Sequence, residues 1–210
     1  MSQEDRGPET PRRQSDEATE HMRRVDEVTE EVHQSEEATP QQLRIARGQG
    51  NAMRRAVENM AEQVHDSGQQ RVGDYVIDYF VEEAVGMYHR LEGALQWHGP
   101  QGDENVHLGL VVREATDGRF LPDLEVYATL LDSARNELGT YQQPFLWHPW
   151  LYRYGRNWRV PEDGEYTLGV RIEPPEFPRM DRAFGVLFPD PVEVVFEGVR
   201  IKTGQKSYSI

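Results

Sequence analysis

The sequence predicts a mostly β protein: an immunoglobulin-like antiparallel β-sandwich of seven or eight strands, preceded by a disordered or helical N-terminal arm. Three observations predict this fold class. From residue 74 onward, apolar and polar residues alternate with the period of two that half-buried strands require. Turn signals separate these segments about every 8–12 residues, the spacing typical of sandwiches. Tyr166 follows the turn Asp163-Gly164, where such sandwiches place a corner tyrosine.

The distribution of aromatic residues divides the chain. All 20 aromatics (4 Trp, 9 Tyr and 7 Phe) follow residue 70. A segment without them, rich in Glu, Gln, Arg and Ser, buries too little apolar surface to offset its ordering entropy. We therefore expect a disordered acidic arm over residues 1–38, an amphipathic helix and linker over 39–71, the sandwich over 72–203 and a tail over 204–210. Thr39-Pro40 is the helix start signal.

The alternating segments give the expected strands in order. They are 75–81, 87–91, 94–98, 106–114, 124–131, 138–145, 165–172 and 192–201. Glu92-Gly93 predicts a hairpin turn, and Asp117-Gly118 is a second strong turn signal. The strands follow one another too closely for crossover helices, which disfavours a parallel α/β sheet.

The composition restricts the function classes. Net charge is −14, and only two of the 23 basic residues are lysine, a balance that resembles halophilic proteins. Nucleic-acid binding is disfavoured because phosphate contacts need basic patches. There are no cysteines, and no apolar run approaches the roughly 18 residues of a membrane span. No apolar segment of a signal peptide follows Arg12-Arg13, so the sequence predicts a cytoplasmic protein.

Catalytic motifs are missing from the sequence. It contains neither a Gly-x-Ser-x-Gly elbow nor a glycine-rich phosphate loop. The sequence therefore predicts no enzyme. Its most unusual stretch is the aromatic-rich segment 145–158, with the candidate interaction residues Trp147, Trp150, Tyr152, Tyr154 and Trp158. Two interpretations stay open: a loop that caps the sandwich with its own side chains, or a surface for a protein partner or a second copy of the chain.

Five short motifs follow one another between residues 105 and 201. They are His107-Leu108, Phe120-Leu121-Pro122-Asp123-Leu124, Tyr154-Gly155-Arg156-Asn157, Ile172-Glu173-Pro174-Pro175 and Arg179-Met180-Asp181. In this order and spacing they resemble a family of bacterial periplasmic proteins that accompany high-affinity iron uptake. The aromatic-rich segment also resembles a halophilic-archaeal branch of that family.

The resemblance implies an immunoglobulin-like sandwich, usually dimeric, that binds copper and iron through histidines, a methionine and a glutamate. The chain departs from that ligand set. Gly109, Arg113, Leu121 and Arg153 stand at the glutamate, second histidine, methionine and third histidine positions, and Met180 stands at or near the last histidine. An arginine does not ligate a cation, and its charge repels one. A rebuilt site would use His107, His148 and Met180.

Two function hypotheses follow. The first is a non-catalytic sandwich protein related to iron-transport accessory proteins, acting as a binding or interaction module. The alternative is a functional copper- or iron-binding protein with a rebuilt His/Met site. No cofactor follows from the residues alone, and copper or iron follows only from the resemblance.

Overall fold

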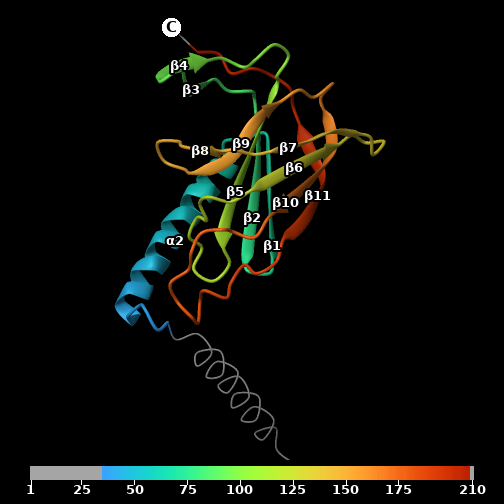
Figure 1. Cartoon of the computed structure of the whole chain (residues 1–210). Coiled ribbons are helices and arrows are strands. Elements are labelled where there is room, and N and C mark those ends of the chain that lie inside the picture. Colours follow the sequence, from blue (N-terminus) through green and yellow to red (C-terminus); the bar gives the residue numbers. More distant parts are fainter. Residues whose placement is uncertain (1–34, 209–210) are drawn as a thin grey trace, which may run out of the picture. The chain divides into compact units, whose positions relative to one another are not determined.

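The computed structural model describes residues 35–208 (Figure 1). The arm expected to be disordered therefore lies, up to residue 34, outside the described residues. The chain divides into two compact units, which we describe separately. The described residues of the small unit are 35–38 and Arg179–Val186, and the large unit comprises Thr39–Pro178 and Leu187–Ile210.

The large unit contains two facing antiparallel sheets and a separate hairpin. The five-stranded sheet has the order β1 (Asp66–Val72), β2 (Tyr75–Glu82), β5 (Val106–Glu114), β9 (Arg153–Trp158), β8 (Phe145–Leu146). The four-stranded sheet has the order β11 (Val192–Ile201), β10 (Gly164–Ile172), β6 (Val126–Leu131), β7 (Glu137–Gln142). The hairpin pairs β3 (Met87–Leu91) with β4 (Ala94–His98). The mostly β, sandwich-like fold predicted from the sequence is confirmed.

The sandwich core lies between the two sheets. Period-two alternation sends Leu108 and Leu110 of β5 inward, where they belong to one buried cluster with Ala128 of β6 and Leu168 of β10. Tyr166 closes the edge of this core, and its hydroxyl donates to the carbonyl oxygen of Glu162 at 2.7 Å. This hydrogen bond to the backbone a few residues upstream is the expected tyrosine corner.

The outer face of the five-stranded sheet is partly covered by α2 (Pro40–Ala61), which packs against it in Figure 1. Val57 and Met60 of the helix form a second buried cluster with Phe80 of β2 and Val111 of β5. All nine residues of β5 are buried. None of the helices in residues 35–208 combines the length and hydropathy needed to cross a membrane.

The start of α2 is the one that the sequence predicts. The side chain of Thr39 accepts from the backbone of Gln42, while the Gln42 side chain accepts from the backbone of Thr39 at 2.8 Å. This reciprocal pair satisfies two otherwise unpaired donors, as a capping box does.

The described chain has eleven strands, whereas the sequence predicted seven or eight. Three of the observed strands were not predicted. β1 occupies a polar segment assigned to the linker, because an edge strand needs only backbone pairing along β2. β8 and β9 fall in the segment assigned to an aromatic-rich connection.

Candidate functional site

β9 brings a polar group together on the outer face of the five-stranded sheet. His107 of β5 stands opposite Glu82 of β2 on one side and Asn157 of β9 on the other. Because alternate residues share a face, Gly109 and its partner Gly155 follow on the same side. The position of the predicted ligand His107 is therefore defined by three adjacent strands.

His107 is fully buried and held in one tautomer. Its Nδ1 lies 3.0 Å from Asn157 Oδ1, and the Asn157 amide nitrogen donates to the carbonyl oxygen of Val85 at 2.8 Å. With Asn157 oriented in this way, Nδ1 of His107 carries the hydrogen and Nε2 presents a lone pair, for which the described chain offers no hydrogen-bond partner. Burial, and then the charge of Arg153, lower the pKa of His107 to about 3, so the ring is neutral.

Arg113 and Arg153, which the motif resemblance sets at ligand positions, both have carboxylate partners. Arg153 donates through its guanidinium to Glu82 at 2.5 Å. Gly109 leaves room for the Arg153 side chain, since a Cβ on Gly109 would lie 3.2 Å from the Arg153 guanidinium. Arg113 donates twice to Asp78, at 2.9 and 3.0 Å, and both side chains are buried. Each of these two positions is thus occupied by an arginine that is paired with a carboxylate.

The predicted set of His107, His148 and Met180 stays a prediction, and the structure describes the surroundings of each residue separately. His148 lies close enough to Arg153 for that charge, after burial, to lower its pKa as it does for His107. Met180 is 84 % exposed and belongs to the small unit. No group of three or more His, Asp or Glu side chains within residues 35–208 is arranged to hold a metal.

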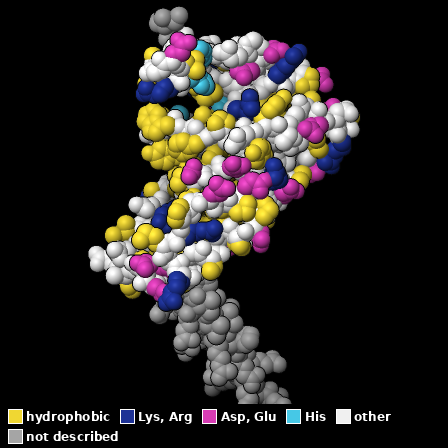
Figure 2. All heavy atoms as spheres, in the orientation of Figure 1, with side chains coloured by type: hydrophobic (Ala, Val, Ile, Leu, Met, Phe, Trp, Pro, Cys, Tyr) yellow, Lys and Arg dark blue, Asp and Glu magenta, His cyan; other side chains and the backbone are white. Residues whose placement is uncertain are grey.

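The predicted interaction residues divide into two groups. Trp147, Trp150 and Tyr152 are 70, 43 and 44 % exposed. Figure 2 shows hydrophobic side chains gathered over the segment between β8 and β9, beside a hollow with histidine side chains at its edge. Tyr154 and Trp158, by contrast, are 1 and 2 % exposed. The prediction for these two is wrong, because the alternation of β9 turns them into the sandwich core.

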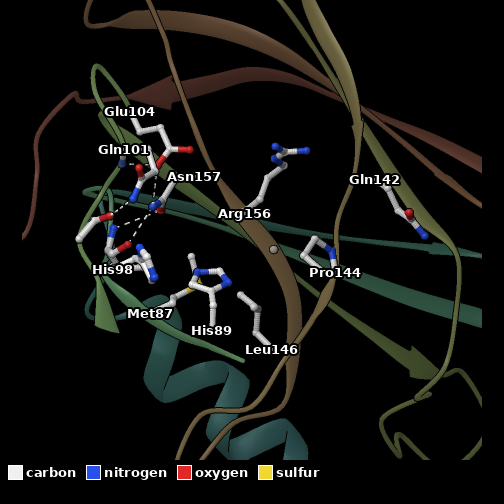
Figure 3. Close-up of a pocket in the computed structure, with 13 residues that line it drawn as sticks. Met87, His89, His98, Gln101, Glu104, Gln142, Pro144, Leu146, Arg156 and Asn157 are labelled. Atoms are coloured by element: carbon white, nitrogen blue, oxygen red, sulfur yellow. Dashed lines mark hydrogen bonds between the residues drawn. The ribbon is translucent and has the colours of Figure 1, made fainter. Parts of the chain in front are cut away.

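A cavity of about 410 Å³ adjoins the His107 group (Figure 3). Its walls include Met87, His89 and His98 of the β3–β4 hairpin, Glu104, and Gly155 and Asn157 of β9. The cavity reaches towards His107, because a Cβ on Gly155 would lie 3.1 Å from His107 Nε2. Sequence reasoning missed this group of side chains. The alternation of a strand places Met87 and His89 on one face. That His98 stands next to Met87 follows only from the register of the hairpin.

Comparison with known proteins gives matches among solved structures only. No family model matches the chain, and no curated protein matches it. FetP from uropathogenic E. coli, in a structure of protein expressed in the periplasm, is 18 % identical, with a TM-score of 0.53 over 65 % of this chain and 97 % of FetP. The copper-reconstituted P19 protein from Campylobacter jejuni is 16 % identical, with a TM-score of 0.55 over 66 % of this chain and 96 % of P19. A copper-bound variant of FetP has a TM-score of 0.53 and 18 % identity over 64 % of this chain and 94 % of that chain.

These structures share the fold of this chain, which confirms at the level of fold the resemblance seen in the motifs. They also correct the expectation of a cytoplasmic protein. FetP, which has the same fold, was expressed in the periplasm, and this points away from a cytoplasmic location. The expectation rested only on the residues around Arg12-Arg13, which carry no information on the sandwich that follows them.

Proposed function

We propose that this protein is a non-catalytic β-sandwich protein that binds copper through a rebuilt site of histidine and methionine side chains. Support comes from two solved structures of the same fold, a FetP variant that is copper-bound and a P19 protein that is copper-reconstituted. Thioether and imidazole donors favour copper over iron, which also accepts carboxylates. The described chain contains both donor types.

One observation carries the proposal: Nε2 of His98, a residue on the cavity wall, is buried without a hydrogen-bond partner in the described part of the chain. A buried polar atom without a partner costs about 1–3 kcal/mol. Such atoms in a folded protein call for an explanation, and a bound ion is one of the few that apply to an imidazole lone pair.

The test is titration of the full chain with Cu(I), held in a chelator of known affinity, and separately with Cu(II) and Fe(II). We expect one equivalent of copper to bind, with Cu(I) preferred and Fe(II) weak. Absence of saturable copper binding at millimolar metal would overturn the proposal. Because the titration reports binding and not turnover, it tests the copper site independently of the non-catalytic role.

The exposed aromatic side chains favour a second function, contact with another copy of this chain. Trp147 is the most exposed of them, and Phe145 beside it is 48 % exposed. Exposed tryptophans of this kind are typical anchors of protein interfaces. Because the motifs resemble a usually dimeric family, we propose a second copy of this chain as the partner. We expect sedimentation velocity to show a dimer that Trp147→Ser weakens. Tyr88→Ser, which changes a similarly exposed residue of the hairpin, should leave the dimer intact. A monomer at every concentration would contradict this.

A further inference from the structure

We infer that the metal ligands are Met87, His89 and His98 of the β3–β4 hairpin, and that the ion they bind is Cu(I). This inference rests on the proposed copper-binding function and assigns it to a place. The predicted ligand His107 lies outside the set. The argument depends on the hairpin register, on the distance between the two histidines, and on the charges around the cavity.

The register of the hairpin puts the three donors on one face. Met87 stands directly opposite His98, and His89 lies two residues beyond Met87 on the same strand. Side chains two apart on a strand, and side chains of directly paired residues, point to the same side. The thioether and both imidazoles therefore project from one face, and all three side chains line the cavity. Figure 3 shows them together on one wall.

The opposite face of the hairpin is fixed by aromatic packing. Tyr88 and Trp97 meet edge to face with ring centres 5.1 Å apart. Trp97 packs in the same way on Tyr208, with ring centres 5.0 Å apart. The Tyr208 hydroxyl also accepts from the backbone N–H of Gly86 at 2.8 Å. These contacts hold the face that carries Met87, His89 and His98 towards the cavity.

The two histidines are close enough to share one ion. Their ring centres are 5.6 Å apart, with an angle of 78° between the ring planes. An imidazole nitrogen lies about 2 Å from a metal, which places each ring centre about 3.2 Å from it and the two centres at most about 6.4 Å apart. Nε2 of His98 is buried without a hydrogen-bond partner in the described chain, so its lone pair or proton is unused.

The charges of the cavity suit a cation better than those around His107. Glu104 lines the cavity, and its carboxylate accepts from the backbone N–H of Gln101 at 2.8 Å and from the Asn157 amide at 3.2 Å. Arg156, the cation on the cavity wall, lies over the ring of Tyr141 at 4.6 Å, which holds its charge against an aromatic face. His107, in contrast, has the charge of Arg153 beside it.

The donor set identifies the ion. A thioether is a soft ligand and an imidazole suits copper among other transition metals, so this combination favours Cu(I) over the harder Fe(II) or Mg(II). The neighbouring Glu104 adds a negative charge that offsets part of the ion's charge. When bound, Cu(I) would be held and shielded in the cavity, and no electron transfer is needed for this role.

The experiment compares Cu(I) affinity in the full chain and two variants, by competition with a chromogenic chelator. We expect the triple variant Met87→Leu, His89→Gln, His98→Gln to weaken binding by more than about 100-fold, beyond the loss caused by removing a mere outer-shell partner. His107→Gln, the matched control, should bind as the unchanged protein does. X-ray absorption of the loaded protein should show one sulfur and two imidazole neighbours, and Met87→Leu alone should remove the sulfur signal.

The outcomes separate the hairpin assignment from the copper-binding function. Loss of binding in His107→Gln with retention in the triple variant would overturn the hairpin assignment and leave the copper function standing. Retention in both variants, or a spectrum without sulfur, would also overturn the assignment. No copper binding by the unchanged chain would overturn the function itself. If the triple variant fails to fold by circular dichroism, the sulfur signal of Met87→Leu decides the question.

Discussion

Acidification should destabilise this protein through His107, and the size of the effect follows from its burial. The folded-state pKa of His107 is lowered to about 3, mainly by burial, whereas an exposed histidine titrates near 6.5. Between these two values the unfolded chain binds a proton that the folded chain excludes. The contribution of His107 to stability is therefore complete above pH 6.5 and is lost as the pH falls towards 3.

The magnitude is measurable over a narrow pH range. Each pKa unit corresponds to about 1.36 kcal/mol, so lowering the pH from 7 to 5 should remove about 2 kcal/mol from the free energy of unfolding through this one group. Total stabilities of domains are typically about 5–15 kcal/mol. A loss of this size therefore shifts the urea midpoint clearly.

The assay is urea unfolding at both pH values, followed by tryptophan fluorescence at constant salt. The unchanged protein should lose about 2 kcal/mol more between pH 7 and pH 5 than His107→Gln does. Glutamine retains a polar side chain that can donate to Asn157 but does not titrate. All other titrating groups are common to both proteins and cancel in the comparison. Equal losses in the two proteins would refute the conclusion that burial keeps His107 neutral.

Three further changes test the packing of the large unit by denaturant unfolding. Gly50→Ala should strongly destabilise the folded protein, because its Cβ would lie 1.7 Å from the backbone oxygen of Asp117 in the facing loop. Gly48→Ala, with open space around its Cβ, should stabilise the helix by up to about 1 kcal/mol. Equal effects of the two glycine substitutions would contradict the close approach of α2 to the loop that contains Asp117. Asp78→Ala should cost about 3–5 kcal/mol, and Asp78→Leu combined with Arg113→Met should recover most of it. Tyr166→Phe should cost about 1–2 kcal/mol through its lost corner hydrogen bond, and no loss would contradict that role.

Strands that carry apolar alternation could be predicted from the sequence, and those without it could not. β5 and β11 match the expected limits because their inward residues are regularly apolar. β9 was missed because Arg156 stands between Tyr154 and Trp158 and interrupts the alternation. β1 was missed because its pairing to β2 depends on the backbone and leaves little signal in side chains.

The candidate site was predictable only in part. The motifs placed His107 on β5, and they identified Arg113 and Arg153 as arginines at ligand positions. The acids that pair with these arginines, 35 and 71 residues away in sequence, could not be predicted, because the pairing depends on neighbouring strands. The grouping of Met87 with His98 required the hairpin register, although the hairpin itself was predicted from its turn.

The pairing of Arg153 with Glu82 has a consequence for how this protein responds to metal supply. A guanidinium is covalently part of the chain, so chelators cannot strip it and competing ions cannot exchange it. The ion pair of Arg153 with Glu82 therefore stays in place on this face whether metals are scarce or abundant. Copper that occupies the hairpin would raise the melting temperature only by mass action at that one place. We therefore expect the sandwich to fold without metal, and copper to add stability only while it is bound.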